Sequence, residues 1–394
     1  MTTHRLDHVP APTRSLKSTL AALLVGGMLT GCFTSPTPAP NTPPQPLVDG
    51  EWVGHQQALT AAGATPMTRL GELVNDPAGC VTLVGSDHSR QPPTGTVWTA
   101  TSDCTTLSTQ WQASTDFETG TELADVTVLP SNELLAVGHS LHHDNSALAG
   151  LVAVRDLDGR WSTVSQLGKD EDGPAMALAV ERAGGGLVVA GSVGGAATVW
   201  HSDGTPETFT AIDLPVDGDF STSQANRLAV TDDAVIASGR GTDEEGDSTT
   251  LLWRSTDEGR SWDQVDLAAD LARGLRINSV TVTADGEFFA VGQARAEPRG
   301  MGMVSSDGEK WKLLQAPDST SLDVAIPTFD GHIVVVATPM EADSSCGSVG
   351  LLWSGDRWGD FSLPCSEPGE ITGTMLSDKR IALVLGNRLW LRKL

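Results

Sequence analysis

The 394-residue sequence predicts an all-β protein built from seven copies of one four-stranded unit, and three observations support this prediction. First, all eleven tryptophans fall on two positions of a repeat whose aromatic residue returns every 47 to 59 residues. Second, an apolar run such as "LLAVGHS" or "LVVAGS" occurs seven times between these aromatics. Third, no segment after the N-terminus sustains a helical period, apart from a turn or two around Leu267–Leu275. A fixed period of this length indicates a repeat architecture.

Each unit is expected to contain four short strands in a fixed order. The first is a run such as "VTV", the second ends in "VG", the third ends in "LW", and the fourth begins at the repeat aromatic. Short β-branched runs broken by Asp-Gly or Asn are typical of antiparallel hairpins. Seven such units predict a seven-bladed β-propeller of four-stranded antiparallel blades over residues 47–394.

The two ends of this domain predict how the ring closes. The last copy stops after its third strand, at Arg388–Leu394, and the missing fourth strand is present at the start of the domain, as Asp49–Gln57. We therefore expect the N-terminal strand to complete the last blade, which leaves no open sheet edge at the seam.

The turn before the fourth strand carries a recurring motif. "STDEGRSW" has the spacing S-x-D-x-G-x-x-W, and "SSDGEKW" is one residue shorter; their motif residues are Ser255, Asp257, Gly259 and Trp262, and Ser305, Asp307, Gly308 and Trp311. These turns resemble the Asp-boxes of sialidase-like (BNR) propellers, and more eroded copies include the turn with Asp158. The resemblance implies a structural role, in which the carboxylate accepts N–H groups of the turn, glycine adopts left-handed dihedrals and tryptophan packs over the hairpin.

The resemblance to sialidases does not extend to their chemistry. Those enzymes use a tyrosine nucleophile assisted by a glutamate, with an arginine triad that holds the substrate carboxylate. This chain has no tyrosine and no recognisable triad motif. We therefore predict no catalytic residue and no cofactor, although a glycosidase with two carboxylates stays open, because fifty acidic residues always offer some pair.

The N-terminus predicts export and a lipid anchor. Arg5, Arg14 and Lys17 precede a short apolar run, Leu20–Met28, which ends in "LTGC". This resembles the lipobox of bacterial lipoproteins and implies a signal peptide over residues 1–31, a diacylglyceryl group on Cys32, and a position on the outer surface of the cell membrane. Residues 32–46 are rich in proline and predict a stiff tether of about 40 Å, with a proline-based partner motif as the alternative.

Charge and cysteine content limit the partners and the redox setting. The formal net charge is -25, and cleavage of the signal peptide would bring it to about -27, which argues against a nucleic-acid surface. Besides Cys32, the chain has four cysteines. From their places in the predicted blades we expect two disulfides, Cys80–Cys104 and Cys346–Cys365, rather than zinc, because the spacings contain no C-x-x-C pair.

Propellers commonly bind partners on the face formed by the second-to-third and fourth-to-first strand loops. The residues that follow the repeat glycine are expected to open these second-to-third loops, and they vary between blades: Ser86, His139, Ser192, Arg240, Gln293, Thr338 and Asn387. With Arg295 and Arg299, three arginines fall in neighbouring blades of an acidic chain, where they suit a carboxylate or an acidic partner patch. The alternative is that they pair with Asp243, Glu244 and Glu297.

Two other polar segments are interpreted as surface loops. His139, His142, His143 and Asp144 could form a metal site, and Thr242–Asp247 has some likeness to a calcium loop, but neither has a metal-binding spacing. The sequence therefore favours a membrane-anchored binding or assembly scaffold for envelope or secreted proteins. A carbohydrate-binding or glycoside-hydrolysing surface protein is the alternative.

Overall fold

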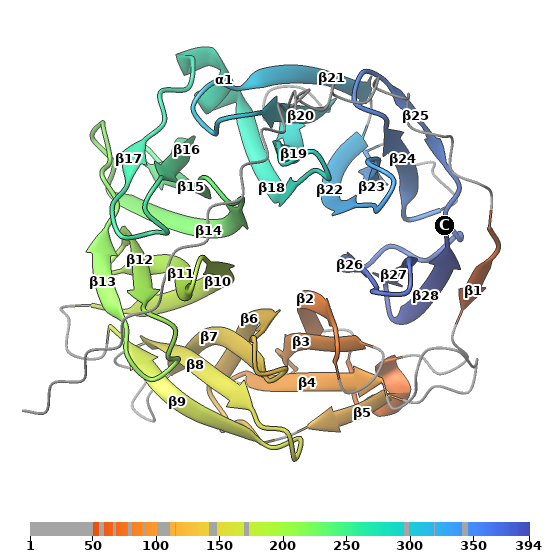
Figure 1. The fold of residues 1–394 in the computed structure, drawn as a ribbon, viewed down its shortest axis with the longest axis horizontal. Helices are drawn as coiled ribbons and strands as arrows, with labels where there is room; N and C mark the ends of the chain where they lie inside the picture. The colour runs from red at the N-terminus through yellow and green to blue at the C-terminus, as the bar shows by residue number, and fades with distance from the viewer. Residues whose placement is uncertain are drawn as a thin grey trace, which may run out of the picture. The chain divides into compact units, whose positions relative to one another are not determined.

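Seven four-stranded sheets form a closed ring around a common axis in the part of the chain that the structure describes (Figure 1). The structure is a computed structural model, and it describes residues 50–54, 59–65, 68–77, 81–89, 92–100, 111–114, 116–141, 148–168, 173–294, 299–318, 320–340 and 346–394. All pairings within the sheets are antiparallel, so the seven-bladed β-propeller predicted from the repeat is confirmed. The signal peptide, Cys32, the tether, Cys80, Cys104 and Arg295 lie outside the described residues.

In blades 1 to 6 the first strand is innermost and the strands follow in chain order outward, whereas in blade 7 the last three strands of the chain are followed outward by the N-terminal strand (Figure 1). Blades 1 to 3 comprise β2 (Thr68–Asn75), β3 (Val81–Asp87), β4 (Thr94–Ala100) and β5 (Trp111–Ser114); β6 (Thr121–Val128), β7 (Leu134–Leu141), β8 (Leu148–Arg155) and β9 (Trp161–Leu167); and β10 (Ala175–Ala183), β11 (Gly186–Val193), β12 (Ala196–Ser202) and β13 (Thr210–Asp213).

Blades 4 to 6 continue the pattern with β14 (Thr222–Val230), β15 (Val235–Thr242), β16 (Ser248–Ser255) and β17 (Asp263–Gln264); β18 (Leu275–Val282), β19 (Phe288–Ala294), β20 (Arg299–Ser305) and β21 (Lys312–Asp318); and β22 (Thr320–Pro327), β23 (Ile333–Pro339), β24 (Val349–Trp353) and β25 (Trp358–Phe361). Blade 7 combines β26 (Ile371–Met375), β27 (Arg380–Leu385) and β28 (Arg388–Lys393) with β1 (Trp52–Gly54). A 3-10 turn, η1 (Leu59–Ala62), precedes blade 1, and α1 (Ala269–Gly274) falls within the segment where the sequence allowed a helical turn.

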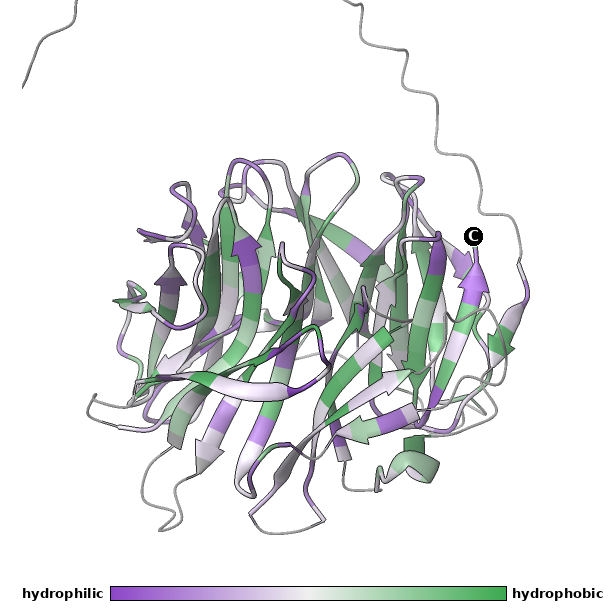
Figure 2. Ribbon diagram, turned by 60° about the horizontal axis from the view of Figure 1, so that its bottom comes forward, coloured by the Kyte–Doolittle hydropathy of each residue, from purple (hydrophilic) through white to green (hydrophobic). Residues whose placement is uncertain are grey.

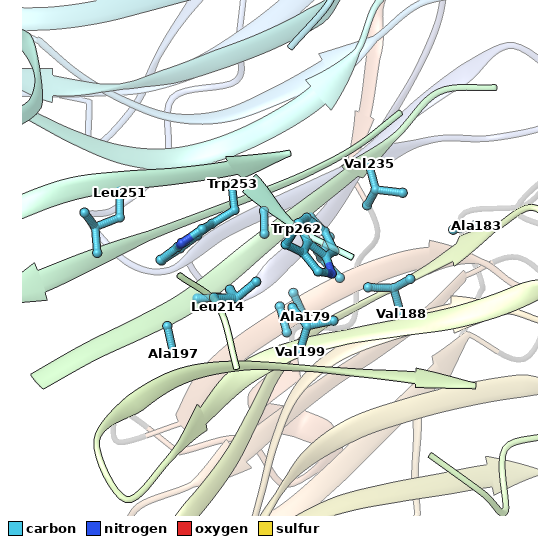
Figure 3. Packing of buried hydrophobic residues seen from close by; sticks show 14 residues of the cluster. Ala179, Ala183, Val188, Ala197, Val199, Leu214, Val235, Leu251, Trp253 and Trp262 are labelled. Atoms are coloured by element: carbon cyan, nitrogen blue, oxygen red, sulfur yellow. The ribbon is translucent and has the colours of Figure 1, made fainter. Parts of the chain in front are cut away.

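The core lies between neighbouring blades, because each sheet turns alternate side chains toward the blade on either side. Between blades 3 and 4, Val188 and Val199 pack against Val235, Trp253 and Trp262 (Figure 3). The third-strand tryptophans Trp98, Trp200 and Trp253 are almost fully buried. The repeated tryptophans are therefore part of the packing between blades, and Figure 2 shows the apolar residues along the strands and the polar ones in the turns at both ends.

The N-terminal strand closes the ring as predicted. Trp52 is the Cα partner of Arg392 in the β1–β28 pair. Trp52 Nε1 donates a hydrogen bond of 2.6 Å to the Ser362 carbonyl, and Arg392 Nη1 donates one of 3.0 Å to the same oxygen. The Arg392 guanidinium lies 4.5 Å from the ring centre of Phe361 in blade 6. Blade 7 is thus fastened to blade 6 through a strand that comes from the other end of the domain.

A buried ion pair joins blades 1 and 2. Arg155, at the end of β8, donates two hydrogen bonds of 2.7 Å to the two oxygens of Asp76, which follows β2. The Thr82 hydroxyl also donates to Asp76, and the Asp76 side chain has no exposed surface. A bidentate pair of this kind fixes orientation as well as charge.

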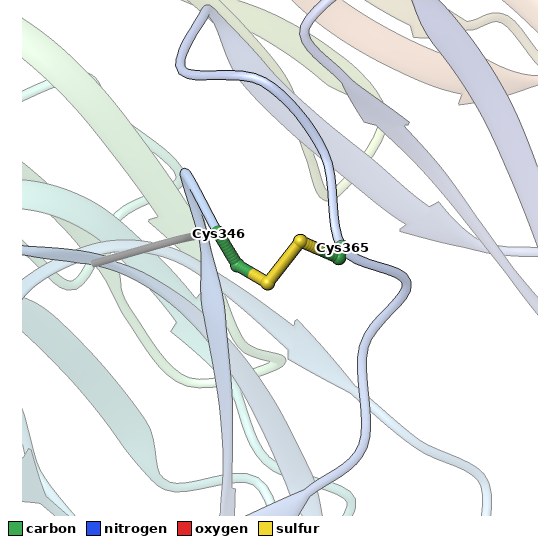
Figure 4. Close-up of a disulfide and its surroundings, with 2 residues drawn as sticks. All are labelled: Cys346 and Cys365. Carbon is green, nitrogen blue, oxygen red and sulfur yellow. A yellow bond between two sulfur atoms is a disulfide. The ribbon is translucent and has the colours of Figure 1, made fainter.

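The predicted disulfide between Cys346 and Cys365 is present, with 5.0 Å between the two Cα atoms (Figure 4). It links the β23–β24 connection to the segment that follows β25, and the Gly347 N–H donates to the Ser366 carbonyl beside it. The bridge therefore holds two loops of blade 6 together at one end of the blade. No helix among the described residues has the length and apolar character needed to span a membrane.

Candidate functional site

The strand directions define two faces of the ring. In an antiparallel blade, the first and third strands begin on the face where the second and fourth end. We call this the entry face. The opposite face, where the third strand turns into the fourth, carries the motif turns and is called the Asp-box face.

On the entry face, the start of each first strand lies beside the end of its second strand. The Cα partners are Arg69 and Ser86, Glu122 and His139, Met176 and Ser192, Gln224 and Arg240, Arg276 and Gln293, and Ser321 and Thr338. Six of the seven predicted loop residues therefore lie within strands, which is a correction: the second strands continue past the repeat glycine. Asn387 alone lies in a turn, between β27 and β28.

Some of these residues have structural roles that the sequence did not indicate. The Ser86 hydroxyl is buried and accepts the Leu123 N–H of the next blade at 2.8 Å. Ser192 is also buried. His139, Arg240, Gln293 and Asn387 keep exposed or half-buried side chains, so these members of the predicted binding face remain accessible to a partner.

On blades 1 and 2, two histidines flank one carboxylate. His139 Nε2 lies 3.1 Å from Glu122 Oε2, and His88 Nε2 lies 3.8 Å from Glu122 Oε1. The hydrogen bond from His139 lowers the pKa of Glu122; partial burial opposes this effect, and the charges of His139, His88 and Arg69 add to it. Glu122 is therefore held as an anion, and Arg69 also stabilises the charged form of Glu370, whose pKa is raised by burial.

On blades 4 and 5, arginines gather at the entry face. Arg240 lies near the end of β15 and is exposed, and Arg299 begins β20 and is half-buried. The structure adds two that sequence reasoning missed, Arg273 in α1 and Arg276 at the start of β18, and both are exposed. Both arginines stand in the segment "LARGLR", which joins the two blades and for which the sequence pattern predicts only a helical turn. We call Arg240, Arg273, Arg276 and Arg299 the arginine sector.

Arg295 and Glu297 of the ion-pair alternative lie outside the part of the chain that the structure describes, and for Arg240 and Arg299 the alternative is not met by the described residues. Among them, no salt bridge involves Arg240 or Arg299. Asp243 instead accepts the Asp247 N–H at 2.7 Å and shapes its own hairpin turn. No group of three or more histidine, cysteine or acidic side chains within the described ranges could hold a metal ion, and His142, His143 and Asp144 lie outside those ranges.

Near the axis of the ring, three carboxylates on the innermost strands interact. Asp125 of β6 accepts the N–H groups of Val126 and, from the next blade, Val180, each at 2.7 Å. Burial raises the pKa of Asp125 to about 6. Burial and the charge of Asp125 raise the pKa of Glu72 and of Glu181 to about 8, and the charge of Arg227 opposes the shift of Glu72.

Water moderates these shifts unequally. Glu72 is exposed, whereas Asp125 and Glu181 are half-buried, so water screens the charge of Glu72 more than that of Glu181. Sequence reasoning missed this cluster, although each acid interrupts an apolar first-strand run, as in "RLGELV", "LADVTV" and "AVERA". The first strands of blades 1 to 6 share a register shift, which lies at Glu72 and at Asp125 and two residues before Glu181, and it changes the alternation of side chains there.

The Asp-box face is built from tightly bonded turns. Asp257 Oδ1 accepts the N–H groups of Arg260 and Ser261 at 3.1 and 2.8 Å, and Gly259 has a φ of 91°. Trp262 Nε1 donates to the Gly259 carbonyl at 3.0 Å. Partial burial opposes ionisation of Asp257, but its bonds to Ser261, Ser255 and Arg260 outweigh this and lower its pKa. These are the contacts expected of a structural turn.

The second motif turn repeats this arrangement, and the eroded one departs from it. Asp307 accepts the N–H groups of Glu309 and Lys310, both at 2.9 Å, and Trp311 Nε1 donates to the Gly308 carbonyl. The Ser255 and Ser305 hydroxyls accept the N–H groups of Gly259 and Gly308. In blade 2, however, Asp156 accepts the Arg160 N–H, not Asp158, so the residue expected there from the motif is wrong by two positions.

A cavity of about 570 Å³ opens on the Asp-box face between blades 3, 4 and 5. Acidic side chains dominate the charged part of its lining: Glu181, Asp232, Asp233 and Glu258, with Arg182 as the one cation in the lining. Glu258 belongs to the motif turn and is ion-paired with Arg260 at 2.8 Å. The cavity is thus part of a bonded, acidic surface rather than a pocket with opposed reactive groups.

Comparisons with known proteins identify the fold only. No protein-family model and no curated protein matches the chain. Among solved structures, the propeller domain of the Trilobed protease from Pyrococcus furiosus is similar at 10% identity and a TM-score of 0.50, over 83% of this chain and 95% of that one. That domain has an open velcro topology, whereas here β1 pairs with β28.

Two sialidases are similar at the same level. A Hadza microbial sialidase matches at 12% identity and a TM-score of 0.51, over 86% of this chain and 67% of that one. The intramolecular trans-sialidase from Ruminococcus gnavus, in complex with oseltamivir carboxylate, matches at 12% identity and a TM-score of 0.50, over 72% of this chain and 93% of that one. The likeness covers the sialidase-like propeller architecture.

Proposed function

We propose that this protein is a lipid-anchored, extracytoplasmic binding protein that presents the entry face of its propeller to a partner protein of the envelope or the secreted fraction. The observation that carries the proposal is the contrast between the two faces. In the motif turns of the Asp-box face, the polar groups form hydrogen bonds with one another. On the entry face, by contrast, Arg240, Arg276, Gln293 and Asn387 are at least partly exposed.

The second candidate is a carbohydrate-related function, which the sialidase-like architecture favours. Sugar sites commonly use exposed aromatic rings, and of the exposed large apolar residues in the described part, Val53, Leu157, Leu313 and Phe329, only Phe329 is aromatic. Asp125, the central acid of the axial cluster, already accepts two backbone N–H groups, which suits a structural role. The protein is therefore proposed to be a non-enzymatic binder.

The face assignment is tested by photo-crosslinking in the native host. A photoreactive amino acid at Gln293, on the entry face, is expected to give a defined adduct. The same amino acid at Leu157, which is 78% exposed in a turn of the Asp-box face, is the control and is expected to give none. An adduct from Leu157 alone would contradict the assignment.

The anchor is tested separately. Two acyl chains give stable membrane attachment, whereas one is marginal. Cys32→Ala should remove metabolic labelling by an alkynyl fatty acid and release the protein from the membrane fraction. Labelling that persists in the variant would show that Cys32 is not the lipidated residue.

A further inference from the structure

Resting on the proposed function, we infer that the arginine sector binds an acidic segment of the partner protein. The sector is continuous across two blades. In blade 5, Arg276 is the Cα partner of Gln293, and Gln293 is the partner of Gly300, which follows Arg299. Paired residues share one side of a sheet and neighbouring strands lie about 4.8 Å apart, so Arg276, Gln293 and Gly300 form a row roughly 10 Å wide on one side of blade 5, and Arg299, one residue along β20, starts from the other side.

Blade 4 adjoins this row directly. Arg240 is the Cα partner of Thr250, and the Thr250 hydroxyl donates a hydrogen bond of 2.5 Å to the Leu275 carbonyl, one residue before Arg276. Arg273 lies in α1, which packs on β16 and leads into β18. The backbones that carry the four arginines are therefore fixed relative to one another before any ligand binds.

The guanidinium groups of the sector are available. Within the described ranges, none of the four takes part in a salt bridge, and none is a hydrogen-bond donor through its side chain. The charge of Arg276 favours ionisation of Asp323 in blade 6, but burial holds the pKa of that carboxyl above its usual value, and Ser321 donates to one of its oxygens. Arginines with structural roles, such as Arg155 and Arg392, are bonded and buried.

The carboxylates around the arginine sector limit which class of anionic ligand can bind there. The β15–β16 hairpin, on the same face, exposes Glu244, Glu245 and Asp247 at its turn, a few residues beyond Arg240 in the chain. A flat anionic membrane laid on the entry face would meet these carboxylates together with the arginines, and a nucleic acid would be repelled by a chain whose net charge is -25. A narrow acidic peptide can contact the arginines alone, and their planar groups suit carboxylates.

The experiment measures binding of fluorescein-labelled hexaglutamate to the full-length protein by anisotropy. The wild type is expected to bind, and 0.5 M NaCl should weaken binding because exposed charges are screened. Arg240→Gln with Arg276→Gln should weaken binding at least tenfold. The matched control is Lys310→Gln with Lys312→Gln, which removes two exposed charges from the Asp-box side of blade 5 and should change affinity less than twofold.

Each other outcome overturns the inference. The inference is overturned if the wild type does not bind hexaglutamate. It is also overturned if the two double variants lose hexaglutamate affinity equally. Vesicles containing phosphatidylglycerol form a second arm, and vesicle binding that depends on the sector while hexaglutamate does not bind would assign it to a membrane instead. If the first double variant does not fold, Arg273→Gln with Arg299→Gln replaces it. If the wild type failed to bind hexaglutamate but still gave the Gln293 adduct, this inference would be refuted and the proposed function would stand.

Discussion

Replacing Trp52 by alanine should weaken the closure of the ring by about 3 kcal/mol. The indole makes an edge-on contact with Phe361, with ring centres 6.1 Å apart, worth about 1 kcal/mol. The Arg392 guanidinium lies 5.7 Å from its ring centre, which adds about 1 kcal/mol. The hydrogen bond from Trp52 Nε1 to the Ser362 carbonyl contributes roughly another 1 kcal/mol. The sum of about 3 kcal/mol lies at the lower end of the free-energy losses found for tryptophan-to-alanine substitutions, as expected for a half-buried side chain.

The assay is thermal unfolding of the full-length protein, followed by calorimetry. For a chain of this size, 1 kcal/mol corresponds to about 2 °C, so Tm should fall by about 6 °C. Val53→Ala is the matched control, since Val53 lies on the same strand and is 42% exposed; its Tm should change by about 1 °C or less. If both variants shifted Tm equally, or if Trp52→Ala melted with the wild type, the seam would not contribute to stability as argued.

Four further predictions concern the turns, the axis, the buried pair and the cysteines. Asp257→Ala should cost about 1–2 kcal/mol because several turn N–H groups lose their acceptor, whereas Asp158→Ala, which removes no recorded hydrogen bond, should melt like the wild type. The folded state keeps protons on Glu181 that the unfolded state loses above about pH 4.5, so stability should decline as pH rises toward about 8, and Glu181→Gln should reduce that decline; an unchanged pH profile of Tm would contradict the shift. Arg155→Ala should cost about 3–5 kcal/mol by leaving Asp76 buried without its cation, against less than about 0.5 kcal/mol for the exposed Arg160→Ala, as measured by urea unfolding. Non-reducing peptide mapping should find Cys346 joined to Cys365 and Cys80 joined to Cys104, and a crossed pair would refute the second of these.

The regular part of the fold could be predicted because it repeats. The spacing of Trp98, Trp200 and Trp253 follows from one packing solution used in successive blades, so each copy adds to the same signal. The strand at Trp52 could be placed for a similar reason, since a blade lacking its fourth strand leaves an unpaired edge. The second strands were placed correctly but ended too early, because the repeat glycine lies inside the strand rather than at its end.

The sequence by itself determined the number of blades, their strand order, the seam and the structural nature of the motif turns, because these depend on local pattern and on a period visible along the chain. Only the tertiary structure decided which side chains meet. Glu122 lies between His88 and His139, and Glu181 interacts with Asp125, because strands far apart in the sequence converge on one face or one axis. The arginine sector depends on the same convergence: the strands that carry Arg240 and Arg276 lie in neighbouring blades that the Thr250 hydrogen bond to Leu275 joins, a contact between blades that no repeat pattern records.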